Sequence, residues 1–168
     1  MIAILCCIVQ QGISQIYYFD NYTVKNGLAQ SNVYAVHQDT LGYLWLGTGS
    51  GISRFDGTEF RNYSSLDSTA GNGVRTICQD NEGVLWFGHT GGGITRRQNG
   101  SFHTVHFDSL DISSDISKIA QDLEGNMWIA TTEQGVLFVK STKGEVSDWE
   151  ITNFKGLEGL SDRVFDII

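Results

Sequence analysis

The hydrophobic residues of this chain fall into short runs that are separated by turns rich in Asp and Gly. Three of these runs contain a tryptophan at the same place, in Leu44–Leu46, Val84–Phe87 and Met127–Ala130. Each run belongs to the motif Asp-x-x-Gly-x-x-Trp, whose Asp residues stand at 39, 80 and 122, a period of 41 to 42 residues. Short runs rich in branched and aromatic residues predict β-strands. We find no window with convincing helical periodicity.

The repeated motif has the residues of a tight hairpin. Asp in the first turn position accepts hydrogen bonds from N–H groups further along the turn. Gly three residues later supplies the positive φ of a type I turn followed by a G1 bulge. The tryptophan is then buried in a strand, which stabilises the fold by about 2–3 kcal/mol. A second glycine turn follows. The signature residues of the repeats are Asp39, Gly42, Trp45, Gly51; Asp80, Gly83, Trp86, Gly93; and Asp122, Gly125, Trp128, Gly135.

Three repeats in phase predict an all-β fold of four-stranded antiparallel β-propeller blades. We place the repeats at about 27–66, 70–108 and 112–155, with a truncated one from 156. Residues 17–22 resemble residues 59–63, the last strand of the first repeat. We therefore expect three complete blades, an opening outer strand and the start of a fourth blade. Such a ring is incomplete, so the chain is expected to be a fragment of a larger protein. The alternative is an open three-blade stack that associates with copies of itself.

The first strand of each blade is expected to begin at Val33, Val74 or Ile116. In each case another apolar residue stands three positions later, at Val36, Ile77 or Ile119. Simple strand alternation would place the two residues on opposite faces of the sheet. A local β-bulge in each first strand is one explanation.

Residues 1–14 are interpreted as a signal peptide and residues 15–168 as the partial propeller. Ile2–Val9 is an apolar run too short to span a bilayer, and the small residues Gly12 and Ser14 suit cleavage near Gln15. No Lys or Arg precedes the run. We would expect this if the basic start of the signal peptide is missing from this sequence. This interpretation predicts a periplasmic or extracellular location. The alternative is a buried first strand.

The net charge and the cysteines argue against several classes of function. The formal net charge of −8 argues against a nucleic-acid or anionic-membrane partner, which would require a basic patch. Cys78 stands where the other repeats have His37 and Ala120, so we interpret it as a small buried residue and not as a reactive thiol. No disulfide framework is visible.

The repeated pattern resembles the two-component regulator propeller repeat. Residues 27–57 match it nearly throughout, residues 74–94 and 116–136 match its core, and residues 159–168 match its opening. The resemblance implies the periplasmic sensor region of hybrid histidine kinases of Bacteroidetes-like bacteria. It further implies an oligosaccharide ligand, missing C-terminal blades, Ig-like and kinase domains, and a homodimer in the full-length protein.

Candidate ligand contacts are few, and the sequence predicts no catalysis, cofactor or metal site. His89 replaces Thr48 and Thr131 at a turn that reaches a propeller face, and its default interpretation is a solvated loop histidine. The predicted ligand-binding residues are Asn32, Arg75 and His89. His103 and His106, three residues apart on a strand, are a poor metal pair.

The signature Asp residues are interpreted as turn caps and the tryptophans as core residues, because both recur inside the repeat. The sequence and the resemblance together predict a sensor propeller that binds a carbohydrate-type ligand and signals to a downstream kinase. The alternatives are a propeller enzyme of the lyase type, which would need His89 with a second in-register His or carboxylate, and a plain protein-interaction scaffold.

Overall fold

The computed structural model describes residues 18–107, 110–140 and 149–156. Within these ranges the chain forms three four-stranded antiparallel sheets, each in simple sequential order. Two short 3-10 helices, η1 (Val24–Asn26) and η2 (Ser65–Asp67), precede the first and second sheets. The strands are β1 (Val33–Gln38), β2 (Leu44–Thr48), β3 (Gly51–Phe55), β4 (Phe60–Tyr63), β5 (Val74–Gln79), β6 (Leu85–His89), β7 (Ile94–Gln98), β8 (Ser101–Val105), β9 (Ile116–Gln121), β10 (Met127–Thr131), β11 (Val136–Lys140) and β12 (Glu150–Phe154).

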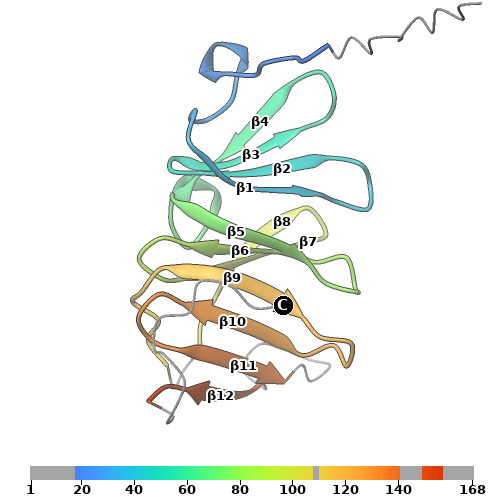
Figure 1. The fold of residues 1–168 in the computed structure, drawn as a ribbon. Coiled ribbons are helices and arrows are strands. Elements are labelled where there is room, and N and C mark those ends of the chain that lie inside the picture. Colours follow the sequence, from blue (N-terminus) through green and yellow to red (C-terminus); the bar gives the residue numbers. More distant parts are fainter. Residues whose placement is uncertain (1–17, 108–109, 141–148, 157–168) are drawn as a thin grey trace, which may run out of the picture.

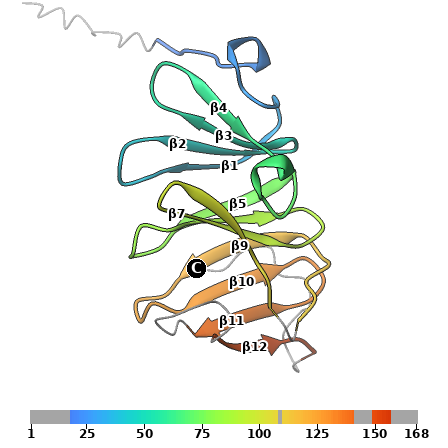
Figure 2. The same ribbon diagram turned by 180° about the vertical axis from the view of Figure 1, so that it is seen from behind.

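The three sheets stack in sequence order, and their first strands β1, β5 and β9 lie next to one another (Figure 1, Figure 2). Propeller blades are arranged in this way around an axis. The predicted all-β fold of four-stranded propeller blades is therefore confirmed, and the blades of the described part do not close into a ring.

The signature Asp holds both the turn and the tryptophan of its repeat. Asp39 Oδ1 accepts hydrogen bonds from the N–H groups of Leu41 (3.0 Å) and Tyr43 (2.9 Å). Its Oδ2 accepts a bond of 2.7 Å from the indole N–H of Trp45. Gly42 has a φ of 90° and donates its N–H to the Asp39 carbonyl, as the predicted turn with a bulge requires. The spacing Asp-x-x-Gly-x-x-Trp is thus set by one carboxylate that binds a turn and a ring.

The same clamp recurs in the other two blades. The indole of Trp86 donates to Asp80 at 2.8 Å, and the indole of Trp128 donates to Asp122 at 3.0 Å. Trp45 and Trp86 are buried, with exposed fractions of 0% and 2%. Trp128 is only half-buried and packs on Phe138, since no further blade covers this face among the described residues. The structural interpretation of the signature agrees with these contacts.

Neighbouring blades are joined by an apolar core that contains residues of both. Between the first and second blades, Trp45 and Ile52 of the first pack against Val74, Phe87 and Phe102 of the second. A small residue at the end of the tryptophan strand permits this approach. A Cβ atom on Gly47 would lie 2.8 Å from Val74 Cγ1, and one on Gly88 would lie 2.5 Å from Ile116 Cγ2.

A glutamine just before the signature Asp links the second blade to the first and the third blade to the second. Gln79 Nε2 donates to the Gly83 carbonyl of its own turn (3.0 Å), while its Oε1 accepts the N–H of Thr40 in the first blade (3.0 Å). Gln121 likewise donates to the Gly125 carbonyl (3.1 Å) and accepts the N–H of Asn81 (2.8 Å). These bonds fix the register of one blade against the next.

Each first strand contains a β-bulge near its start. Val33 pairs with Thr48 and Ala35 with Gly47, so Tyr34 is the extra residue on β1. The register shifts at the same place on β5 and on β9, where the extra residues are Arg75 and Ser117. The bulge accounts for the spacing of three between apolar residues, as the sequence suggested.

The opening segment differs from its expected form. Residues 18–23 carry no strand, because no partner strand pairs with them in the described residues. Tyr22 nevertheless packs on the first blade, with its ring 4.9 Å from that of Phe55 and 5.7 Å from that of Phe60. Tyr63 contacts Phe102 of the second blade in a similar way, at 4.8 Å. The predicted signal peptide (1–14) and most of the truncated repeat from 156 lie outside the described residues.

Candidate ligand-binding face

The two ends of the blades carry different chemistry. We call the end at which β1, β5 and β9 begin the start face; the turn between β6 and β7 lies at the same end, because Val74 pairs with His89. The Asp-x-x-Gly turns occupy the opposite end, after the first strands. The turns on the start face differ between the repeats, whereas the invariant Asp-x-x-Gly turns lie at the other end.

Arg75 lies at the centre of a row that crosses all three blades on the start face. Its guanidinium is 2.9 Å from Asp115 Oδ2 in the third blade, and its Cζ lies 5.2 Å from the centre of the Tyr34 ring in the first blade. Asp115 Oδ1 accepts the N–H of Gly91 in the β6–β7 turn at 2.7 Å. We call Tyr34, Arg75 and Asp115 the Arg75 row.

The Arg75 row is accessible from solvent. The side chain of Arg75 is 44% exposed and that of Asp115 is 24% exposed, and Tyr34 as a residue is 49% exposed. Tyr34 and Arg75 are both the extra residues of their bulges. A bulge changes the direction in which the side chain at its position points. Tyr34 and Arg75 can therefore meet across the boundary between the first and second blades.

Asn32, another predicted ligand contact, is an exposed residue just before β1. It stands two positions from Tyr34 on the same approach to the start face. The structure thus places Asn32 and Arg75 at the same end of the blades.

His89, the third predicted contact, is not a solvated loop histidine. It ends β6 and is 0% exposed, and its Nε2 lies 2.8 Å from Thr95 Oγ1. Thr95 Oγ1 also accepts the N–H of Ala70, so its hydroxyl hydrogen is free to go to the imidazole. The default expectation was wrong because this hydroxyl and the loop around Gly71 enclose the ring.

The burial of His89 keeps it neutral. Burial lowers the pKa of His89 from 6.5 to about 4, against a smaller opposite effect of the Gly73 and Gly71 backbone. Its Nδ1 is buried without a partner of good hydrogen-bond geometry among the described residues. The ring therefore supports the loop beneath the start face and offers no atom to solvent.

The sequence did not single out Tyr34 or Asp115. Alignment of the repeats places Tyr34, Arg75 and Ser117 at one position of the blade, the bulge position. Tyr34 is therefore equivalent to Arg75. Asp115 is the residue just before β9, the position that Asn32 holds before β1. The equivalence of Tyr34 to Arg75, and of Asp115 to Asn32, is the feature of the sequence that could have identified these two residues.

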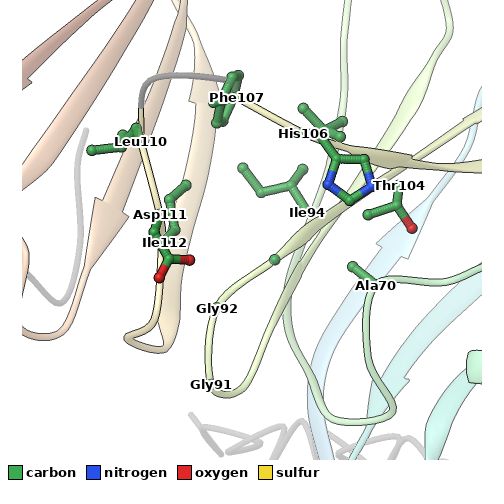
Figure 3. A pocket seen from close by; sticks show the side chains of 12 residues that line it. Ala70, Gly91, Gly92, Ile94, Thr104, His106, Phe107, Leu110, Asp111 and Ile112 are labelled. Atoms are coloured by element: carbon green, nitrogen blue, oxygen red, sulfur yellow. The ribbon is translucent and has the colours of Figure 1, made fainter.

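A hollow of about 620 Å³ lies on the start face beside the second blade (Figure 3). Its floor is Ile94 and Val105, and the glycine turn 91–93 forms one rim. Thr104 and His106 come from the end of β8, and residues 110–112 lead toward β9. Gly91 belongs to the hollow and donates to Asp115, so the glycine turn separates the hollow from the Arg75 row.

His103 and His106 do not act as a pair. His106 lines the hollow, whereas His103 is an exposed residue on β8 that does not. In the described ranges, no group of at least three His, Cys, Asp or Glu side chains is placed to hold a metal ion. A search of the same residues finds no helix that could span a membrane.

The repeat unit matches a known family. The family described as two component regulator propeller matches residues 27–50 and 69–91. Each range contains the entry loop, the first strand, the signature turn and the tryptophan strand of its blade. These two segments thus match two-component regulator propeller repeats. The third repeat has the same clamp geometry, with the Trp128 indole bound to Asp122.

The similar proteins include signalling proteins. Over 54 residues, 31% of this chain, the sequence is 43% identical to Histidine kinase P4 of Formosa agariphila, of which this covers 4%. The extracellular domain of the hybrid two component system BT3049 from B. thetaiotaomicron is 26% identical, with a TM-score of 0.61 over 76% of this chain and 18% of that chain.

A second solved structure agrees in fold alone. The extracellular domain of the hybrid two component system BT4673 from B. thetaiotaomicron reaches a TM-score of 0.72 at 15% identity, over 88% of this chain and 20% of that chain. The chain therefore spans about a fifth of the length of these solved extracellular domains and 4% of the kinase.

Proposed function

We propose that this chain serves as part of the sensor propeller of a hybrid two-component signalling protein. In this proposal the propeller is exported and binds an oligosaccharide on the start face. The observation that carries it is the exposed Arg75 row, which unites one side chain from each blade of a repeat family found in two-component regulators. The relatives are extracellular domains of hybrid two component systems or a histidine kinase, which supports the signalling context.

The chemistry of the row suits a sugar. Sugars present hydroxyl groups around a ring and C–H bonds on its faces, so their sites combine an aromatic face with a few placed polar groups. Tyr34 supplies the aromatic ring, while the Arg75 guanidinium and the Asp115 carboxylate supply planar donors and acceptors. Asn32 adds an amide with both donors and acceptors near the start of β1.

A ligand that binds at the Arg75 row can change the packing of the blades. Arg75 contacts side chains of the first and third blades from the second, so a ligand that competes for Asp115 or Tyr34 alters contacts across two blade boundaries. A ligand shifts a conformational equilibrium only through a difference in affinity for its two states. We propose that this difference in blade packing passes to a kinase in the full-length protein.

The test is a binding measurement with Arg75→Ala against the matched control Arg61→Ala, whose arginine lies on the outer strand β4. Calorimetric titration with a panel of oligosaccharides should show saturable binding without release of shorter products. We expect Arg75→Ala to weaken that binding by at least about tenfold, which corresponds to about 1.4 kcal/mol, and Arg61→Ala to leave it unchanged. Turnover of the saccharide would indicate an enzyme instead, and equal effects of the two substitutions would refute a role for the Arg75 row.

A further inference from the structure

We infer that the hollow beside the glycine turn 91–93 is a second subsite for an uncharged saccharide, adjoining the Arg75 row. This inference rests on the proposed function and adds to it the place of a second subsite and the charge class of the ligand. Three observations carry it: the form of the hollow, the charge of its lining and its connection to Arg75.

The form of the hollow is that of a binding site. Its volume of about 620 Å³ lies within the range of about 300–1,000 Å³ for small-molecule sites. The floor residues Ile94 and Val105 are buried, at 1% and 7% exposure, and supply an apolar base. Figure 3 shows Thr104 and His106 on one side and Asp111 on the other, so an imidazole and a carboxylate lie on opposite sides of it.

One rim of the hollow is a glycine turn with an unusual backbone conformation. Gly91, Gly92 and Gly93 have φ values of 74°, 91° and 85°, a conformation that residues with side chains rarely adopt. At Gly92 an added Cβ would overlap the carbonyl oxygen of Ile112, so the connection to β9 packs directly on this backbone. At Gly91 nothing lies within 4 Å of the place of a Cβ.

The lining selects for a neutral ligand. Among its described residues the lining contains no Lys or Arg and a single carboxylate, that of Asp111. The nearest arginine in the row, Arg75, is already neutralised by Asp115. A phosphate, sulfate or uronate would therefore meet a carboxylate without a free cationic partner. A molecule with hydroxyl groups and apolar C–H faces finds both kinds of partner here.

The glycine turn connects this subsite with the Arg75 row. The N–H of Gly91 donates to Asp115 Oδ1 at 2.7 Å, while Asp115 Oδ2 binds Arg75 at 2.9 Å. Gly91 thus has the hollow on one side and the ion pair on the other. One oligosaccharide chain can extend from Tyr34 across Gly91 into the hollow, and units in the hollow would bind next to the side chains that join the blades.

The experiment titrates the whole chain with uncharged malto-, cello-, xylo- and mannooligosaccharides, and with uronic-acid and sulfated oligosaccharides. Two substitutions obstruct or strip the hollow. Gly91→Asn adds a side chain where space is open, and Asn tolerates a positive φ better than other residues. His106→Ala removes an exposed ring, and His103→Ala on the same hairpin strand is its matched control.

An uncharged oligosaccharide should bind, and His106→Ala and Gly91→Asn should each weaken its binding by about tenfold or more, with less than about twofold loss for His103→Ala. In a proton NMR titration the His106 ring signals should shift and those of His103 should not. Binding that neither substitution affects, or binding of acidic saccharides alone, would overturn this inference and leave the proposed function standing. If no saccharide binds, the proposed function fails and the subsite with it.

Discussion

The buried imidazole of His89 should make the stability of this propeller depend on pH in a range where its carboxylates do not. We choose His89→Thr as the perturbation, because Thr48 and Thr131 hold the same position in the other blades. There each threonine hydroxyl binds a backbone carbonyl of its own turn, at 2.9 Å and 2.8 Å. The substituted residue is therefore compatible with this place in a blade.

The sign and size of the effect follow from the pKa of His89. Burial lowers this pKa from 6.5 to about 4 in the folded state, so between these values the unfolded chain binds more protons than the folded chain. The free energy of unfolding is then greatest above pH 6.5 and falls as the pH drops toward 4. At about 1.4 kcal/mol per pKa unit, the loss amounts to about 3 kcal/mol.

Carboxylates affect stability mostly at lower pH. Hydrogen bonds from the backbone of Glu59 and from Thr58 lower the pKa of Asp56 to about 2, and hydrogen bonds led by the Asn126 side chain lower that of Asp122. The stability that these groups supply is present above their unfolded pKa of 3.8 and is lost as the pH falls through the folded values. A window from pH 4.5 to 7.5 therefore isolates histidine.

The assay is urea unfolding at several pH values in this window, for the original chain and for His89→Thr. The difference in unfolding free energy between the two proteins should shrink by about 2–3 kcal/mol from pH 7.5 to 4.5, since only the original chain loses the histidine contribution. In NMR the His89 ring should titrate near pH 4. A midpoint near 6.5, or a difference between the proteins that does not change with pH, would refute the burial argument.

Two further substitutions test the blade geometry. Asp80→Asn should lower the free energy of unfolding by about 1–3 kcal/mol in urea titration, because an amide cannot accept from both the Val84 N–H and the Trp86 indole as the carboxylate does; the exposed Glu82→Gln is its control, and equal stability of the two variants would contradict the clamp. Gly88→Ala should cost about 1–3 kcal/mol, since the new methyl group would lie 2.5 Å from Ile116 Cγ2. Combining Gly88→Ala with Ile116→Ala should give less than the sum of the single losses, and additive losses would mean that the two residues do not meet.

The parts of the fold that the sequence predicted are those made by neighbours in the chain. Within one hairpin, Asp39 and Gly42 form the turn and Trp45 enters the strand that follows, so the period and spacing carry the information. The blades were predicted for the same reason, because each strand pairs with the next along the chain. Even the bulge left a trace, in the spacing of three between apolar residues.

The candidate site depends on residues that lie about 40 positions apart, and only the tertiary structure brings these together. Tyr34, Arg75 and Asp115 meet because three blades stack with their first strands side by side, and no local pattern records which side chains then face one another. His89 shows the same limit. Its place in the turn was evident from the repeat, but its burial depends on Thr95 and on the loop before β5, which close over it only when the blade is assembled. The sequence by itself thus determined the blades, whereas the packing between loops and between blades decided what the start face presents to a ligand.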